Sequence, residues 1–91
     1  MIEPEILEQL EEFSSLMFTV AEIAIILEVN PAELKDVIED PDTDFFKAFQ
    51  KGRLQREAEV RTSIFNLAKN GSSPAQLSAL KLIENAKMDD V

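Results

Sequence analysis

An all-α fold is predicted by three features of this 91-residue sequence. Apolar residues recur at the three- and four-residue spacing of helices, and no stretch shows the convincing alternation of a strand. Helix start signals, each a Ser, Thr or Asn followed closely by a Pro or an acid, occur at several positions. The absence of cysteine excludes the alternative of a small, loop-rich fold held together by disulfides. We therefore expect a single domain over residues 1–91, with an N-terminal helix-turn-helix followed by a long helical hairpin.

Two short helices are predicted before residue 28. Pro4 suits the first position of a helix, and apolar residues follow it at helical spacing: Ile6, Leu7, Leu10 and Phe13. Thr19 and Glu22 have the spacing of a capping box, in which each side chain accepts a hydrogen bond from the other residue's backbone N–H. We expect the second helix to begin there and to bury a stripe formed by Ile23, Ile26 and Leu27.

Another start signal follows almost at once. Asn30 is suited to cap a helix, Pro31 to its first position and Glu33 to its third. Two helix starts so close together require a sharp turn, which is the shape of a helix-turn-helix. The inner face of its second helix is expected to consist of Leu34, Val37 and Ile38. The alternative is an αα-corner that only packs against the rest of the fold.

A long helix and a final helix are predicted in the second half. The long helix runs over about residues 44–70, after an aspartate-rich break that offers caps. Gly52 inside it permits a bend or close packing, and Gly71 is suited to end it. Ser73 and Gln76 have the spacing of a second capping box. The inner face of the last helix is expected to consist of Leu77, Leu80 and Ile83.

The two halves of the chain differ in charge. Residues 1–44 contain thirteen acidic side chains and one basic side chain, whereas residues 45–91 contain five acidic and eight basic ones. The helix-turn-helix predicts DNA binding. Because a DNA duplex is a polyanion, the negative charge of residues 1–44 opposes that binding. The residues of the motif that would face a DNA groove are Asn30, Ala32, Glu33, Lys35, Asp36 and Glu39. Phosphate contacts from the long helix would come from Lys47, Lys51 and Arg53.

The long helix carries apolar residues on two faces. The first face consists of Phe45, Phe46, Phe49, Val60, Ile64 and Leu67. The second lies about 140° away around the helix and consists of Leu54, Ala58 and Phe65. Since a helix buried on one side does not need a second apolar face, these three residues are candidate contacts between subunits. The alternative is that the N-terminal helices cover both faces within one monomer.

No catalytic or metal site is predicted. The sequence has no histidine or cysteine, and its Asp40-x-Asp42-x-Asp44 run lacks the glycine and the closing glutamate of a calcium loop. Residues 23–27, the longest apolar stretch, are too few to cross a bilayer, and the acidic N-terminus lacks the basic start of a signal peptide. We expect a cytoplasmic, non-enzymatic protein with no cofactor, metal or membrane partner.

Three segments, taken in order, resemble the small terminase subunit of tailed bacteriophages and prophages. They are the helix-turn-helix, then Asp44–Arg53 with Glu57 and Glu59, and then Ile64–Gly71 followed by Ala79–Asn85. The resemblance covers about residues 19–87. It implies a protein of the bacterial host cell that binds the packaging site on double-stranded phage DNA and delivers it to the large terminase subunit. It also implies a homo-oligomer, such as a ring.

On this resemblance, residues 30–39 form the helix that faces the DNA groove and residues 45–87 form the oligomerisation region. Assembly would raise a weak monomer affinity, because linked copies add effective concentration without new contacts. Two alternatives stay open. One is a helical protein–protein interaction module with a basic partner. The other is a transcriptional regulator whose dimer reads half-sites about one DNA turn apart.

Overall fold

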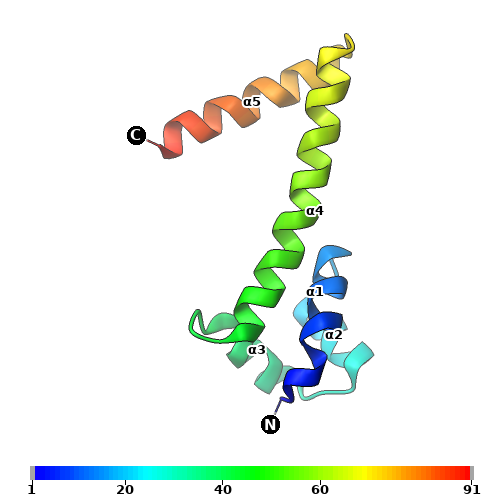
Figure 1. The fold of residues 1–91 in the computed structure, drawn as a ribbon, viewed down its shortest axis with the longest axis vertical. Helices are drawn as coiled ribbons and strands as arrows, with labels where there is room; N and C mark the ends of the chain where they lie inside the picture. Colours follow the sequence, from blue (N-terminus) through cyan, green and yellow to red (C-terminus); the bar gives the residue numbers. More distant parts are fainter. Residues whose placement is uncertain (1, 91) are drawn as a thin grey trace. The chain divides into compact units, whose positions relative to one another are not determined.

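The computed structural model describes residues 2–90, and within them the fold is entirely helical apart from short turns (Figure 1). A short 3₁₀-helix, η1, spans Pro4–Ile6. The α-helices are α1 (Leu7–Ser15), α2 (Val20–Leu27), α3 (Pro31–Glu39), α4 (Asp44–Lys69) and α5 (Ser73–Asp89). The predicted all-α class is confirmed. None of the described helices combines the length and the apolar character needed to span a membrane.

The chain forms two compact units, residues 1–56 and residues 57–91, called here the first and the second unit. The boundary lies inside α4, so the beginning of this helix packs with the N-terminal helices. The boundary between the two units follows residue 56, whereas the excess of acidic residues ends at residue 44. The two boundaries therefore differ.

The first unit has a core built by its short helices. The buried apolar residues of this core are Ile2, Leu10, Ile23, Ala24, Leu34 and Ile38. Half-buried residues from the start of α4, including Phe45 and Phe49, pack against it. The rings of Phe13 and Phe18 meet edge to face, with centroids 6.0 Å apart. The predicted inner face of α3 is confirmed at Leu34 and Ile38, while Val37 is half-buried.

The predicted stripe of α2 is wrong at one position. Ile26 is 44% exposed, whereas Ile23 and Ala24 are buried. At 100° per residue, Ile26 lies outside the stripe that Val20, Ile23, Ala24 and Leu27 form along this helix. The small Ala24 side chain takes the inner position that was predicted for Ile26.

Helices α1 and α4 approach each other closely at Gly52. A Cβ atom on this residue would overlap the Glu11 carbonyl oxygen and lie 3.0 Å from the Ser14 Cβ. Ser14 is fully buried, and its hydroxyl donates a hydrogen bond to the Phe49 carbonyl. Close packing at this glycine is therefore confirmed.

Three helices end in a Schellman motif, in which one residue adopts a positive φ and the next N–H bonds to a carbonyl five residues earlier. The residues with positive φ are Met17 (68°), Glu28 (57°) and Gly71 (97°). The N–H to carbonyl bonds run from Phe18 to Phe13, from Val29 to Ala24 and from Ser72 to Leu67. The predicted stop at Gly71 is confirmed. Met17 and Glu28 adopt the same conformation without the freedom of glycine.

The capping box at the start of α2 is confirmed. The Glu22 N–H donates to the Thr19 hydroxyl (3.2 Å), and the Thr19 N–H donates to a Glu22 carboxylate oxygen (2.9 Å). The bond from the Thr19 backbone N–H stabilises the charged carboxylate and lowers the pKa of Glu22.

The caps of the last two helices differ from the prediction. Helix α4 is capped by Thr43, whose hydroxyl accepts a hydrogen bond from the Phe46 N–H (3.1 Å), and not by an aspartate. The predicted capping box at Ser73 is wrong by one residue, because the Gly71 turn leaves Ser72 at the cap, where its hydroxyl accepts from the Ala75 N–H (3.4 Å). The Gln76 amide instead donates to the Ala68 carbonyl (3.1 Å).

The second unit has little buried surface. Within this unit, α5 diverges after the turn from the part of α4 that follows residue 56 (Figure 1), so the predicted hairpin is an open one. Ala75 and Ala79 are the buried residues of α5. The predicted inner face is wrong, since Leu77, Leu80 and Ile83 are 69%, 55% and 42% exposed. Two alanines at i, i+4 spacing give α5 a small-residue contact face, which leaves the larger side chains outside.

Candidate nucleic-acid interface

Helices α2 and α3 form the tight pair that the sequence predicted. The turn between them is short, with Glu28 in the left-handed conformation and Val29 half-buried. The Asn30 side-chain oxygen accepts a hydrogen bond from the Glu33 N–H (3.0 Å) and so fixes the start of α3. Because Leu34 and Ile38 are buried in the core, the opposite side of α3 is held outward.

The predicted groove-facing residues of α3 are all exposed: Asn30, Ala32, Glu33, Lys35, Asp36 and Glu39. The Asn30 oxygen is occupied by the cap, so its amide nitrogen is the group that can donate to a ligand. The Lys35 ammonium lies 3.9 Å from the Glu39 carboxylate in an exposed i, i+4 pair, a contact that stabilises little. The structure therefore brings these residues together on a surface that is rich in carboxylates.

The predicted phosphate-binding residue Arg53 links α4 to the end of α1. Its guanidinium donates to the carbonyl oxygens of Ser14 (3.1 Å) and Phe18 (2.8 Å), and it lies 4.7 Å from the centre of the Phe49 ring. Carbonyls at a helix C-terminus have no partner within the helix and carry partial negative charge. Arg53 therefore holds the C-terminal end of α1 in place.

Arg56 has a similar structural contact that the sequence pattern did not suggest. Its Nε donates to the Ser15 carbonyl (2.8 Å). The i, i+3 spacing between the two arginines was the available signal, because it places both on one side of α4. Neither guanidinium is held toward α3.

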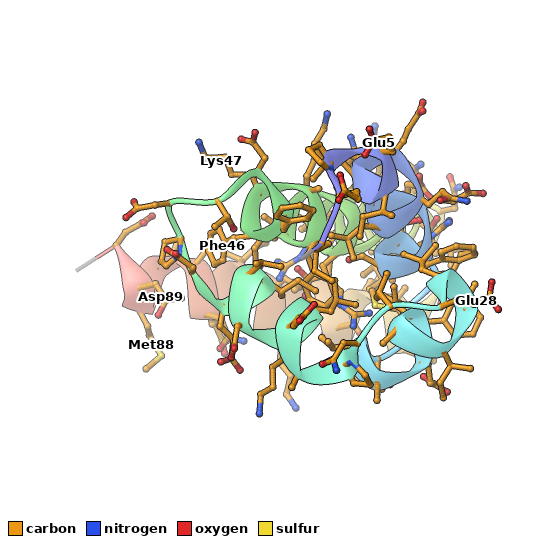
Figure 2. The ribbon with its side chains drawn as sticks, turned by 90° about the horizontal axis from the view of Figure 1, so that it is seen from below. Glu5, Glu28, Phe46, Lys47, Met88 and Asp89 are labelled. Atoms are coloured by element: carbon orange, nitrogen blue, oxygen red, sulfur yellow. The ribbon has the colours of Figure 1, made fainter. Side chains whose placement is uncertain are left out.

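The two lysines predicted for DNA contact differ in environment. Lys51 lies 3.7 Å from a Glu11 carboxylate oxygen of α1. Lys47 is exposed and extends away from the ribbon (Figure 2). Of the three basic residues predicted on α4, Lys47 is thus the one best placed to meet an anion.

The candidate subunit contacts on α4 are exposed. Leu54, in the first unit, is 58% exposed, so the N-terminal helices do not cover the second apolar face at that position. In the second unit, Ala58 is exposed and Phe65 is 42% exposed. Part of the first face is exposed as well, since Val60 and Leu67 are each more than half exposed. Apolar surface of this kind commonly marks a protein–protein contact.

Over residues 2–90, no group of three or more carboxylates is placed so that it could hold a metal ion. Comparisons of the chain with protein-family models, with curated proteins and with solved structures gave no match. Its function must therefore be inferred from the residues of this chain. They form an exposed, acid-rich second helix in a helix-turn-helix pair, together with exposed apolar positions on α4 and α5.

Proposed function

We propose that this chain is a non-enzymatic phage DNA-packaging protein of the small-terminase type. It acts in the cytoplasm of a bacterial host cell as a homo-oligomer, which recognises double-stranded phage DNA and passes it to the large terminase subunit. The observation that carries the proposal is the α2–α3 pair, in which α3 is anchored by Leu34 and Ile38 and exposes its other side. The packaging role rests on the sequence resemblance over residues 19–87.

DNA contact by one copy is weak, because Glu33, Asp36 and Glu39 share the outer surface of α3. The Asn30 amide and the Lys35 ammonium are the donors that α3 offers to phosphates or base edges. Several linked copies would compensate for weak individual contacts. The exposed apolar surface of the second unit supports such self-association.

An anisotropy titration with labelled phage-end DNA at low and rising salt tests the DNA role. We expect affinity to fall with salt, and the salt slope to decrease by about one for Lys35→Glu or Lys47→Glu. Lys87→Glu, near the end of α5, is the matched control and should leave the slope unchanged. Arg53 is unsuitable for this test because it holds α1. Absence of binding at low salt would contradict the DNA role.

Molecular mass in solution, measured by light scattering, tests the oligomer. We expect a mass of many subunits, and a lower mass for Leu54→Lys combined with Phe65→Lys, because charge disfavours a buried apolar contact. Ile25→Lys is the matched control, since Ile25 is 74% exposed on α2 of the first unit. A dimer that binds DNA would favour a transcriptional regulator, and a monomer would contradict the assembly.

A helical protein–protein interaction module is the second candidate. It is favoured by the carboxylate-rich surface of α3 and by the engagement of Arg53 and Arg56 with α1. This candidate predicts that the chain binds a basic protein surface and that the DNA titration shows no binding at any salt concentration.

A further inference from the structure

A groove lies on one side of α3, within the first unit. It has a volume of about 380 Å³ and is lined by Ile2, Glu33, Asp36, Val37 and Phe45. Three structural elements contribute its apolar wall: the N-terminal segment supplies Ile2, α3 supplies Val37 and α4 supplies Phe45. Ile2 is buried and the other two apolar residues are half-buried. The wall of this groove is therefore continuous with the core.

Among the described residues, the lining of this groove, called here the α3 groove, carries only negative charge. Glu33 and Asp36 are exposed carboxylates, and none of the described residues that line it is basic. Two other hollows of the first unit differ. The one beside Glu12 and Gln55 is also acidic but has no apolar side chain in its lining, and the one beside Lys47 carries charges of both signs. The α3 groove thus combines apolar walls with negative charge.

The acidic character continues along the chain beside the groove. Residues 30–44 contain six acidic side chains and one basic side chain, Lys35. At 100° per residue, Lys35 lies about 160° around α3 from Glu33, whereas Glu39 lies about 60° from Asp36. The basic residue and its partner Glu39 are not among the residues that line the groove.

We propose that the α3 groove binds a basic amphipathic segment of a partner protein. Apolar side chains of the segment would lie against Ile2, Val37 and Phe45, as in other helix-in-groove contacts. Its lysines and arginines would extend their aliphatic stems along the wall and place their charges near Asp36. Charge complementarity selects this occupant, since the exposed carboxylates of the groove attract lysine and arginine side chains. The proposal does not require that the chain bind DNA.

The test uses three labelled peptides of equal length. One is an amphipathic leucine–lysine peptide, the second replaces its lysines with glutamates, and the third is oligolysine. We expect the leucine–lysine peptide to bind most tightly in an anisotropy titration. Asp36→Asn should weaken that binding about tenfold, because a charged hydrogen bond is lost. Val37→Thr should weaken it about threefold or more, because a hydroxyl interrupts the apolar wall.

Glu39→Gln is the matched control, because it removes the same charge from the same helix at a residue that does not line the groove. It should change the affinity less than twofold. Two results would show that the attraction is a general one between opposite charges and would overturn the proposal. One is an equal loss of peptide affinity for Asp36→Asn and Glu39→Gln. The other is binding of oligolysine as tight as that of the leucine–lysine peptide. Equal binding of the leucine–glutamate peptide, or no peptide binding at all, would also overturn it.

Two further measurements distinguish binding of a partner protein in the α3 groove from self-association and from DNA binding. If Asp36→Asn lowered the mass measured by light scattering, the occupant would be a second copy of the chain, and the proposal of a partner protein would be wrong. Asp36 is exposed, so its variant should keep the unfolding midpoint of the unaltered chain. Loss of DNA binding with peptide binding retained would refute the packaging role alone, and the reverse result would refute the groove alone.

Discussion

The first and second units contain helices with similar start and stop signals, yet among the described residues only the first unit fully buries large apolar side chains. Leu10, Ile23 and Leu34 are fully buried in the first unit. In the second unit, Leu77 and Leu80 are more than half exposed, and the buried residues of α5 are two alanines. Helix signals are local and determine where a helix begins and ends. Burial depends on which other helix is available to pack against it.

The units also differ in the contacts that hold their helices together. In the first unit, side chains of α4 reach α1 through Arg53 and Arg56, and the two helices approach closely at Gly52. In the second unit, the contacts near the turn are the Gln76 amide on the Ala68 carbonyl and the alanine face of α5. The first unit therefore has the denser set of contacts between its helices.

The largest expected effect is on the free energy of unfolding, and it should differ between the two units. Leu34→Ala should lower the free energy of unfolding by about 2–5 kcal/mol, because it leaves a cavity in the core. Leu80→Ala, the same change at an exposed site, should cost no more than about 0.5 kcal/mol. Denaturant unfolding at a fixed protein concentration measures both. A large cost at Leu80 would show that another subunit covers it in solution.

Gly52→Ala should be next in size. The new methyl group would overlap the Glu11 carbonyl, so α1 and α4 must separate, at a net cost of about 1–3 kcal/mol despite the better helix propensity of alanine. Gln55→Ala, on the exposed surface of the same helix, is the control and should be nearly neutral. Stabilisation by Gly52→Ala would contradict the close approach of the two helices.

Two of the three left-handed helix ends should respond in opposite directions. Gly71→Ala should destabilise by about 1 kcal/mol, since a side chain is strained at φ 97°. Glu28→Gly should stabilise by about 0.5–1 kcal/mol, because it removes that strain from the turn between α2 and α3. Thermal unfolding of both variants beside the parent chain measures the pair. Changes of the same sign would contradict this account of the turns.

The smallest effect concerns pH. Because the folded-state pKa of Glu22 is lowered, its carboxylate stabilises the first unit above its ordinary pKa of 4.5, and this contribution is lost as pH falls through the lower folded value. Glu22→Gln should therefore be less stable than the parent chain near neutral pH, and the difference should shrink in acid. Unfolding midpoints across an acid-to-neutral series test this. A difference that does not change with pH would exclude the capping carboxylate as its cause.

Local signals in the sequence predicted much of the fold. Thr19, Asn30 and Gly71 were identified as helix ends because capping and the left-handed turn depend on a few neighbouring residues. The inner positions of α3 followed from periodicity in the same way. The sequence alone therefore determined the helix order, the tight α2–α3 turn and the unequal charge of the two halves.

The tertiary structure decided what no local pattern contains. Arg53 resembles a phosphate-binding residue in the sequence, but its neighbours in space are carbonyl oxygens thirty-five and thirty-nine residues away along the chain. The exposed leucines of α5 have the spacing of a buried face, but α5 diverges from the part of α4 that follows residue 56 (Figure 1). The α3 groove likewise exists because Ile2 and Phe45, far apart in the sequence, meet beside α3. Such contacts depend on how helices pack together, which the periodicity within one helix does not specify.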